Sequence, residues 1–264
     1  MAREFQVRRE QRLPAPPDQV WEAVATGPGN LGWLYPMEIE PRVGGRVTRG
    51  DATVLAWEPP RHLAVKATQE GGFSNTLTYR VEPADDGTSH LRMGIHWVHT
   101  GVVDEAWQWD AKTDVAEKYV DFHQHALAEY LRHFAGRRAV YVRAQCPEPT
   151  ADPADFAALR RRLGVPDGAV AGDRFPLLVP GPGNGPVEAV VDWTGPDFLG
   201  LRGPDALYRF FNGSSWNVPI WLGHHLFAED ADEERATEEW TAWLHDTLGR
   251  AVPAGVGAED GGRP

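Results

Sequence analysis

Two histidines are the side chains of this chain best suited to acid–base chemistry. His99 ends a segment in which polar and apolar residues alternate, and His123 lies in a segment with helical periodicity. An imidazole changes charge near neutral pH, so either ring could accept or release a proton during a reaction. Asp104, Glu105 and Asp110 lie between them in sequence and could orient either ring. An ordinary surface or hydrogen-bonded histidine remains the simpler explanation for each.

The residues needed for other common chemistry are missing or wrongly spaced. His123 and His125 would lie roughly 200° apart around a helix and cannot bind one metal together. The single cysteine, Cys146, precedes a proline, and no Gly-x-Ser-x-Gly nucleophile motif occurs. The glycine-rich segment 181–185 lacks the Lys-Ser/Thr pair of a phosphate-binding loop. We therefore expect no metal and no cofactor.

Aromatic and apolar residues form the second candidate site. Alternation along residues 88–99 places Met93, Trp97 and His99 on one strand face, which we interpret as the inward one. They indicate a pocket for an apolar, aromatic small molecule, with Tyr79 and His99 as polar anchors. The open alternative is that these side chains only fill a core. The predicted ligand contacts are Trp33, Tyr35, Tyr79, Met93, Trp97, His99, Trp107, Tyr119 and Phe122, with Trp33, Tyr35 and Trp107 at the opening.

A repeated turn indicates how these residues are positioned. Trp57, Pro60 and Leu63 recur as Trp193, Pro196 and Leu199, each 136 positions later, and both segments have the pattern of strand, turn and strand. The pattern predicts a tandem duplication. In both halves we expect the tryptophan to pack within the fold rather than contact a ligand.

The order of elements is similar in both halves. The first half predicts a strand, two short helices, several antiparallel strands and a long helix, and the second repeats this in reduced form. The predicted strands are 4–12, 46–48, 52–57, 62–67, 75–82, 88–99, 139–144, 175–179, 187–193, 198–201, 207–211 and 218–227; the predicted helices begin near Pro17 and Pro153 and span 110–134 and 232–248, with a break at 27–30.

Four segments of the first half carry a family resemblance: PPDQVWEAV, PRVGGRVTRG, ATVLAWEPPRHL and TLTYRVEPADDGTSHLRM. Residues 3–134 resemble bacterial proteins similar to the activator of heat-shock-protein-90 ATPase, in the START/SRPBCC superfamily. The resemblance implies the helix-grip fold, a curved antiparallel sheet around a C-terminal helix. We therefore predict an α+β protein of two tandem helix-grip domains, residues 1–136 and 137–250, followed by a disordered tail, 251–264.

Composition restricts the partners and the compartment. The formal net charge of −12 argues against nucleic-acid binding, which needs a basic surface. One cysteine excludes an intrachain disulfide, and neither a secretory leader nor a membrane span is expected. These features favour a cytoplasmic protein.

Three functions are compatible with this sequence. The first is binding of a hydrophobic, aromatic small molecule in the first domain, with the second domain in a supporting role. The second is an enzyme of the same fold, a cyclase, dehydratase or hydrolase of specialised metabolism, in which His99 or His123 moves protons. The third is a protein-interaction module, which the resemblance to chaperone activators allows.

Overall fold

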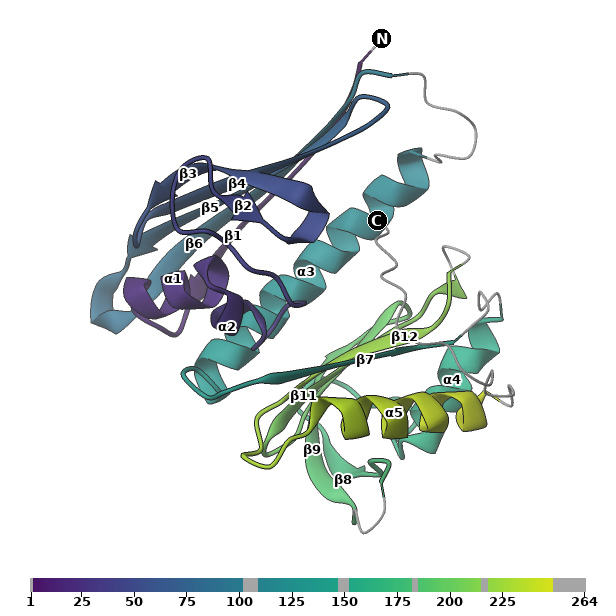
Figure 1. Ribbon diagram of the computed structural model, residues 1–264. Coiled ribbons are helices and arrows are strands. Elements are labelled where there is room, and N and C mark those ends of the chain that lie inside the picture. Colours follow the sequence, from purple (N-terminus) through teal and green to yellow (C-terminus); the bar gives the residue numbers. More distant parts are fainter. Residues whose placement is uncertain (1, 102–108, 147–151, 182–184, 215–217, 249–264) are drawn as a thin grey trace. The chain divides into compact units, whose positions relative to one another are not determined.

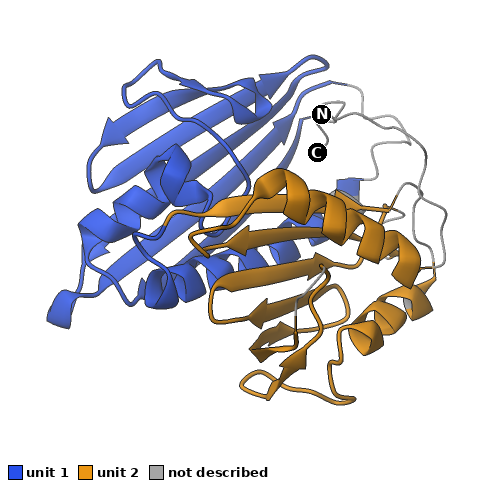
Figure 2. Ribbon diagram, turned by 60° about the horizontal axis from the view of Figure 1, so that its bottom comes forward, with its two compact units in different colours: residues 1–137 blue, residues 138–264 orange. Residues whose placement is uncertain are grey.

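The computed structural model describes residues 2–101, 109–146, 152–181, 185–214 and 218–248. Trp107, Asp104, Glu105 and the predicted tail lie outside the described residues, as does the side chain of Asp110. The chain forms two compact units, residues 1–137 and 138–264 (Figure 2). Each unit is described separately below.

The first unit has one six-stranded antiparallel sheet and three α-helices (Figure 1). The strands lie in the order β1-β6-β5-β4-β3-β2. Two 3₁₀ turns, η1 and η2, join strands at Arg49–Asp51 and Asp85–Gly87. The elements are β1 (Arg3–Leu13), α1 (Pro17–Ala25), α2 (Gly27–Asn30), β2 (Arg46–Val47), β3 (Ala52–Glu58), β4 (His62–Gln69), β5 (Phe73–Pro83), β6 (Ser89–His99) and α3 (Trp109–His133).

Local sequence accounts for the boundaries of these elements. Pro17 begins α1, where its missing N–H costs no helical hydrogen bond, and Thr26 accepts a hydrogen bond from the Gly29 amide at the start of α2. The break expected at residues 27–30 is thus a single helical turn. Gly87, with φ of 76°, allows the tight connection between β5 and β6.

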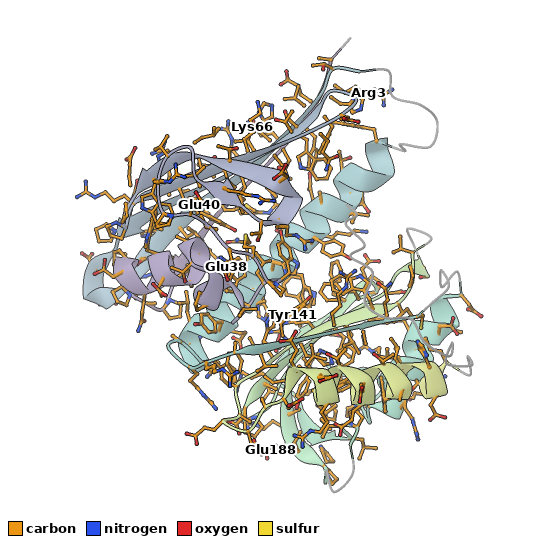
Figure 3. The ribbon with its side chains drawn as sticks, viewed as in Figure 1. Arg3, Glu38, Glu40, Lys66, Tyr141 and Glu188 are labelled. Carbon is orange, nitrogen blue, oxygen red and sulfur yellow. The ribbon has the colours of Figure 1, made fainter. Side chains whose placement is uncertain are left out.

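The helix α3 runs along one face of this sheet, which we call the inward face (Figure 1). Val7 and Leu13 of β1 point to it and are buried, whereas Arg8 and Arg12 point to the opposite, exposed face. Alternation along the strand therefore separates the interior from the solvent. Lys66 of β4 also lies on the outer face, away from α3 (Figure 3).

The second unit has the same topology. Its strands lie in the order β7-β12-β11-β10-β9-β8, which repeats the order of the first sheet position by position. A core of buried apolar residues joins the sheet to both helices. The elements are β7 (Val140–Gln145), α4 (Pro153–Arg162), β8 (Arg174–Leu177), β9 (Val187–Thr194), β10 (Phe198–Arg202), β11 (Ala206–Phe211), β12 (Trp221–Leu226) and α5 (Glu233–Thr247).

Both copies of the repeated turn join neighbouring antiparallel strands, as predicted, but their tryptophans differ. Trp57 lies opposite Leu63 on the inward face and packs edge-on against Trp21 of α1, with ring centroids 5.1 Å apart. Trp193 lies opposite Gly200, whereas its neighbour Thr194 lies opposite the core residue Leu199. Trp193 therefore points away from the helices of its unit, whereas Trp57 points toward a helix.

The length of the turn explains this difference. Both strands have a bulge at the same place in the ladder, Leu55 in β3 and Asp192 in β9, but five residues separate the paired Trp57 and Leu63, whereas four separate the paired Thr194 and Leu199. The shorter turn displaces β9 by one position relative to the sequence repeat, so its side chains exchange faces. Thr194 occupies the helix side in the second unit, where its hydroxyl accepts a hydrogen bond of 2.8 Å from Arg160 of α4.

The sheets, helices and tandem arrangement confirm the predicted fold class. Every predicted strand is present, as are the helices predicted from Pro17, from Pro153, over 110–134 and over 232–248, with ends that differ by a few residues at most. The second short helix, α2, lies at Gly27–Asn30, where a break was expected. In the part of the chain that the structure describes, no helix is both long and apolar enough to cross a bilayer.

Candidate functional site

The inward face of the first sheet changes character along its strands. Near α1, Tyr79 of β5 and Met93 of β6 are opposite each other and buried. Two residues further along the same face, the pair Leu77 and Ile95 is only half-buried. The same holds for the next pair, Asn75 and Trp97. The fold thus leaves apolar surface on this face incompletely covered.

Aromatic rings gather at this incompletely covered end. Trp97 contacts Phe5 and Phe73, with ring centroids 5.2 and 5.8 Å away. His99 lies 6.4 Å from Phe73 and 6.5 Å from Trp109 at the start of α3. We call these five residues the distal cluster. Because β1, β5, β6 and α3 each contribute a ring, the cluster joins the sheet to the helix.

A second group of rings lies nearer α1. His123 is 6.4 Å from Tyr35 and 5.9 Å from Tyr119. Burial raises the pKa of Tyr79, and the nearby Tyr35 phenol raises it further. Tyr79 is therefore a neutral hydroxyl at physiological pH, able to donate a hydrogen bond. We call Tyr35, Tyr79, Tyr119 and His123 the proximal cluster.

Arg49 packs on the ring of Tyr35 in the proximal cluster. Its guanidinium lies 3.3 Å from the centre of the Tyr35 ring, in the geometry of a cation–π contact. Arg49 belongs to η1, whose Gly50 lies against Ala67 of β4. Sequence reasoning missed Arg49, because only the fold brings η1 over Tyr35.

The two proposed polar anchors lie in different clusters. His99 follows Met93, the cross-strand partner of Tyr79, by six residues, which corresponds to about 20 Å along a strand. His123 follows Trp109, the neighbour of His99, by 14 residues, or about 21 Å along a helix. Tyr79 and His99 therefore cannot hold one small polar group together, and the two histidines cannot share one proton-transfer step.

Polar side chains on β1 attach the sheet to α3. Arg9 donates to both carboxylate oxygens of Asp121, at 2.5 and 3.2 Å, and lies 3.7 Å from Glu117. The hydrogen bond with Asp121 raises the pKa of Arg9. Gln11 donates to the side chain of Gln124. Sequence reasoning missed these residues as well, although their inward position in an alternating strand was a usable signal.

The remaining predicted contacts occupy the interior. Trp33 is 1% exposed, and its indole N–H donates to the Ala23 carbonyl at 2.9 Å. Trp33 therefore does not border the opening of a pocket, contrary to what we expected from the sequence. Phe122 of α3 is fully buried. Direct ligand contact by any of the predicted residues stays a prediction.

The corresponding interior of the second unit is filled. His224 is fully buried, with the rings of Tyr208, Phe210 and Trp240 centred 5.2, 4.8 and 4.4 Å away. Its Nδ1 accepts a hydrogen bond of 3.1 Å from the Arg209 amide. Burial is the main cause that lowers the pKa of His224, and His225 and Arg209 lower it further. This ring is a packed, neutral core residue.

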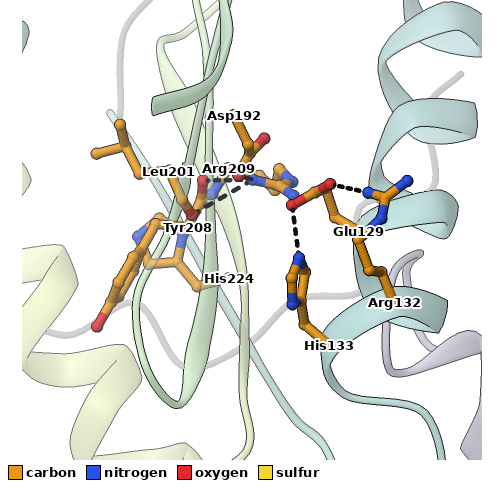
Figure 4. Close-up of polar contacts among 8 residues, drawn as sticks. All are labelled: Glu129, Arg132, His133, Asp192, Leu201, Tyr208, Arg209 and His224. Atoms are coloured by element: carbon orange, nitrogen blue, oxygen red, sulfur yellow. Dashed lines mark hydrogen bonds and ion pairs between the residues drawn. The ribbon is translucent and has the colours of Figure 1, made fainter. Parts of the chain in front are cut away.

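A buried ion pair lies on the opposite face of the second sheet. Arg209 and Asp192 form a contact of 2.9 Å, and their side chains are 2% and 3% exposed (Figure 4). Arg209 also donates to the carbonyls of Tyr208 and Leu201. A Cβ at Gly200 would lie 2.4 Å from the Asp192 carboxylate, so glycine is needed there.

On α3 of the first unit, Glu129 contacts Arg132 and His133 (Figure 4).

Neither unit shows a metal site in its described part. Among the described residues, no three His, Cys, Asp or Glu side chains come together as metal ligands would. The candidate site of this chain is therefore the inward face of the first sheet, with its two aromatic clusters.

Comparison with known proteins agrees with this fold. Residues 4–131 match the sequence profile of the family described as polyketide cyclase/dehydrase and lipid transport. The match covers the first unit, and the second unit repeats its strand order, in agreement with two tandem helix-grip domains. No curated protein matches the chain.

Several solved structures are similar to one or both units. MLL2253 from Mesorhizobium loti is 21% identical, with a TM-score of 0.41, and the match covers 49% of this chain and 98% of that protein. The di-domain ARO/CYC BexL from the BE-7585A biosynthetic pathway is 14% identical, with a TM-score of 0.43, and is matched over 93% of this chain and 96% of its own. DynU16, a putative protein in the dynemicin biosynthetic locus, is 16% identical, with a TM-score of 0.39, over 92% and 96%.

Proposed function

We propose that the first unit of this tandem helix-grip protein binds a hydrophobic, aromatic small molecule between the inward face of its sheet and α3. The observation that carries the proposal is the row of half-buried residues Leu77, Ile95 and Trp97, which follows the buried pair Tyr79 and Met93 along this face. Apolar surface left uncovered inside a fold is a common property of ligand sites. The description of the matching family names cyclases, dehydrases and lipid transport, and it supports an apolar ligand.

A plugging variant tests this function. Leu77 points inward from β5, and its neighbour Thr76 points outward, so Leu77→Trp fills the proposed site and Thr76→Trp is a matched control. We expect wild-type protein to bind fluorene-type aromatic compounds in equilibrium dialysis. Leu77→Trp should weaken this binding at least tenfold, whereas Thr76→Trp should preserve it. If Leu77→Trp fails to fold, Leu77→Phe provides a milder plug.

Two outcomes would contradict ligand binding at this site. One is the absence of any bound aromatic compound in the wild-type protein. The other is unchanged affinity in a folded Leu77→Trp variant, which would place the compound elsewhere.

Ring closure with loss of water is the second candidate function, and the proximal cluster favours it. His123 could remove a proton from carbon next to a carbonyl, while the neutral Tyr79 hydroxyl donates a hydrogen bond to the carbonyl oxygen. The distal His99 would take no part in this step. The family description, which includes cyclases and dehydrases, supports this chemistry.

A small diketone tests the catalytic alternative. The compound 2,6-heptanedione closes to 3-methylcyclohex-2-enone and one water, and the enone product is followed by its ultraviolet absorbance. We expect His123→Ala and Tyr79→Phe to abolish any acceleration by the wild-type protein, with His96→Ala, on the outer face, as the control. Unchanged turnover in both variants would exclude this role for the cluster.

A further inference from the structure

Asn75 and Trp97, in the distal part of the site, each have a side-chain polar atom without a hydrogen-bond partner among the described residues. The Asn75 side-chain oxygen and the Trp97 indole nitrogen are both buried, and neither bonds to any described residue. Asn75 and Trp97 are direct cross-strand partners on the inward face of β5 and β6. An amide and an indole N–H thus lie side by side, within the layer that the proposed ligand would enter.

Two unpartnered polar groups destabilise the folded protein unless a ligand forms hydrogen bonds with them. A buried polar group without a partner destabilises a protein, and nearly all such groups are paired in folded proteins. The flanking residues are apolar, with Phe5 and Phe73 against the Trp97 ring. A leucine and a phenylalanine at these positions would pack without this cost. The polar pair therefore requires an explanation beyond packing.

The surroundings indicate what would satisfy the pair. Phe5, Phe73 and Trp97 offer flat apolar faces for a planar ring system. Arg9, the charged side chain next along the inward face of β1, already contacts Asp121 and Glu117. An uncharged ligand is thus favoured. The indole N–H can only donate a hydrogen bond, whereas the amide can accept one from a ligand hydroxyl.

We propose that Asn75 and Trp97 determine the specificity of this site, by selecting an uncharged aromatic ligand that carries both a carbonyl and a hydroxyl group. Trp97 donates to the carbonyl oxygen, and Asn75 accepts from the hydroxyl. This inference rests on the proposed binding function. Because both atoms are covered in the free protein, binding includes a small rearrangement of the aromatic side chains around them.

Three related compounds separate the contributions of packing and hydrogen bonding. Fluorene offers only an aromatic surface, 9-fluorenone adds an acceptor, and 2-hydroxy-9-fluorenone adds a donor as well. Affinities are measured by equilibrium dialysis for the wild-type protein, Trp97→Phe, Asn75→Leu and the outward-facing control Thr76→Val. A neutral hydrogen bond corresponds to about tenfold in affinity.

We expect wild-type affinity to rise from fluorene to the hydroxyketone. Trp97→Phe should weaken both ketones about tenfold and leave fluorene unchanged. Asn75→Leu should weaken only the hydroxyketone, and Thr76→Val should change nothing. The indole N–H resonance of Trp97, identified by its loss in Trp97→Phe, should shift when 9-fluorenone is added.

Failure of this inference differs from failure of the binding function. Equal wild-type affinity for all three compounds, or equal losses for all three in the variants, would overturn the role of the polar pair while binding itself stands. An unmoved Trp97 resonance at saturating 9-fluorenone would also overturn it. Binding of none of the compounds would overturn both proposals.

Discussion

The two units share one strand order but differ in length at one end. Strands β5 and β6 have 11 residues each, whereas β11 and β12, at the same positions of the second sheet, have six each. The closing helix has 25 residues in the first unit and 15 in the second. The longer strands carry the half-buried row and the distal cluster. The comparison therefore associates incomplete burial with the added length.

The interiors of the two units also differ in how completely their side chains are buried. In the second unit, Trp240 of α5 lies against Tyr208, Phe210 and His224 of the sheet, and all four are buried. In the first unit, the inward pairs Leu77–Ile95 and Asn75–Trp97, beyond Tyr79 and Met93, keep partial exposure, whereas His99 at the end of β6 is buried. In the second unit, a few large rings fill the space between the short helix and the short strands. In the first unit, the longer helix and strands leave part of the inward face uncovered. The first unit is the place to seek a ligand.

Removing one tryptophan from each interior should give the largest difference. Trp240→Ala removes a fully packed ring and should lower the free energy of unfolding of the second unit by about 4 kcal/mol. Trp97→Ala removes a half-buried ring and should cost the first unit only about 1–2 kcal/mol. Urea-dependent hydrogen exchange, followed in peptides from β11 and from β5, measures each unit separately. Equal losses would remove the distinction between a filled and an incompletely filled interior.

Breaking one ion pair in each unit should give a smaller difference in stability between the units. Asp192→Asn leaves Arg209 buried without its carboxylate and should destabilise the second unit by about 3 kcal/mol. Asp121→Asn breaks a pair whose side chains are 34% and 44% exposed, so solvent screening limits its cost to less than about 1 kcal/mol. Urea titrations of both variants compare them. A larger effect at Asp121 would show that attachment of β1 to α3 governs stability.

Acid should weaken the second unit through His224. Its pKa is lower in the folded protein than the ordinary value of 6.5, so above that pH the ring is neutral whether the chain is folded or not. As the pH falls below about 6.5 the unfolded chain takes up the proton first, and stability decreases by about 1.4 kcal/mol per pH unit until the folded pKa is reached. Unfolding of the second unit at pH 7 and pH 5 measures this loss.

A substitution isolates the contribution of this ring. His224→Leu should reduce the difference in stability between pH 7 and pH 5, because no proton can then bind at that position. His96→Leu, on the exposed outer face of the first sheet, is the control and should leave the slope of the second unit unchanged. A slope that persists in His224→Leu would assign the acid sensitivity to another group.

Much of the fold could be predicted, because its signals are local. Alternation in residues 88–99, helical periodicity in 110–134 and the glycine and proline turns each depend on neighbouring residues, and all agree with the structure. The order of elements then indicated the helix-grip arrangement. The prediction that the first domain binds the ligand, with the second in a supporting role, stays a prediction, and the longer strands of the first unit support it.

The site was less predictable, because its geometry depends on register. Tyr79 and His99 both face inward, as alternation suggested, but pairing of β5 with β6 separates them along the sheet. Arg49 reaches Tyr35 only because η1 folds over β4. The unpartnered atoms of Asn75 and Trp97 depend on packing in three dimensions, and no sequence pattern reveals them.

The shorter turn of the second unit has a wider consequence for how repeats are compared. One residue fewer between Thr194 and Leu199 than between Trp57 and Leu63 shifts β9 by one position and reverses the parity of its side chains. Letters that align between the halves, Trp57 and Trp193, then belong to opposite surfaces, while Thr194 inherits the position that Trp57 holds. Transfer of a functional role from one repeat to the other is valid only after the odd and even positions of each strand have been matched.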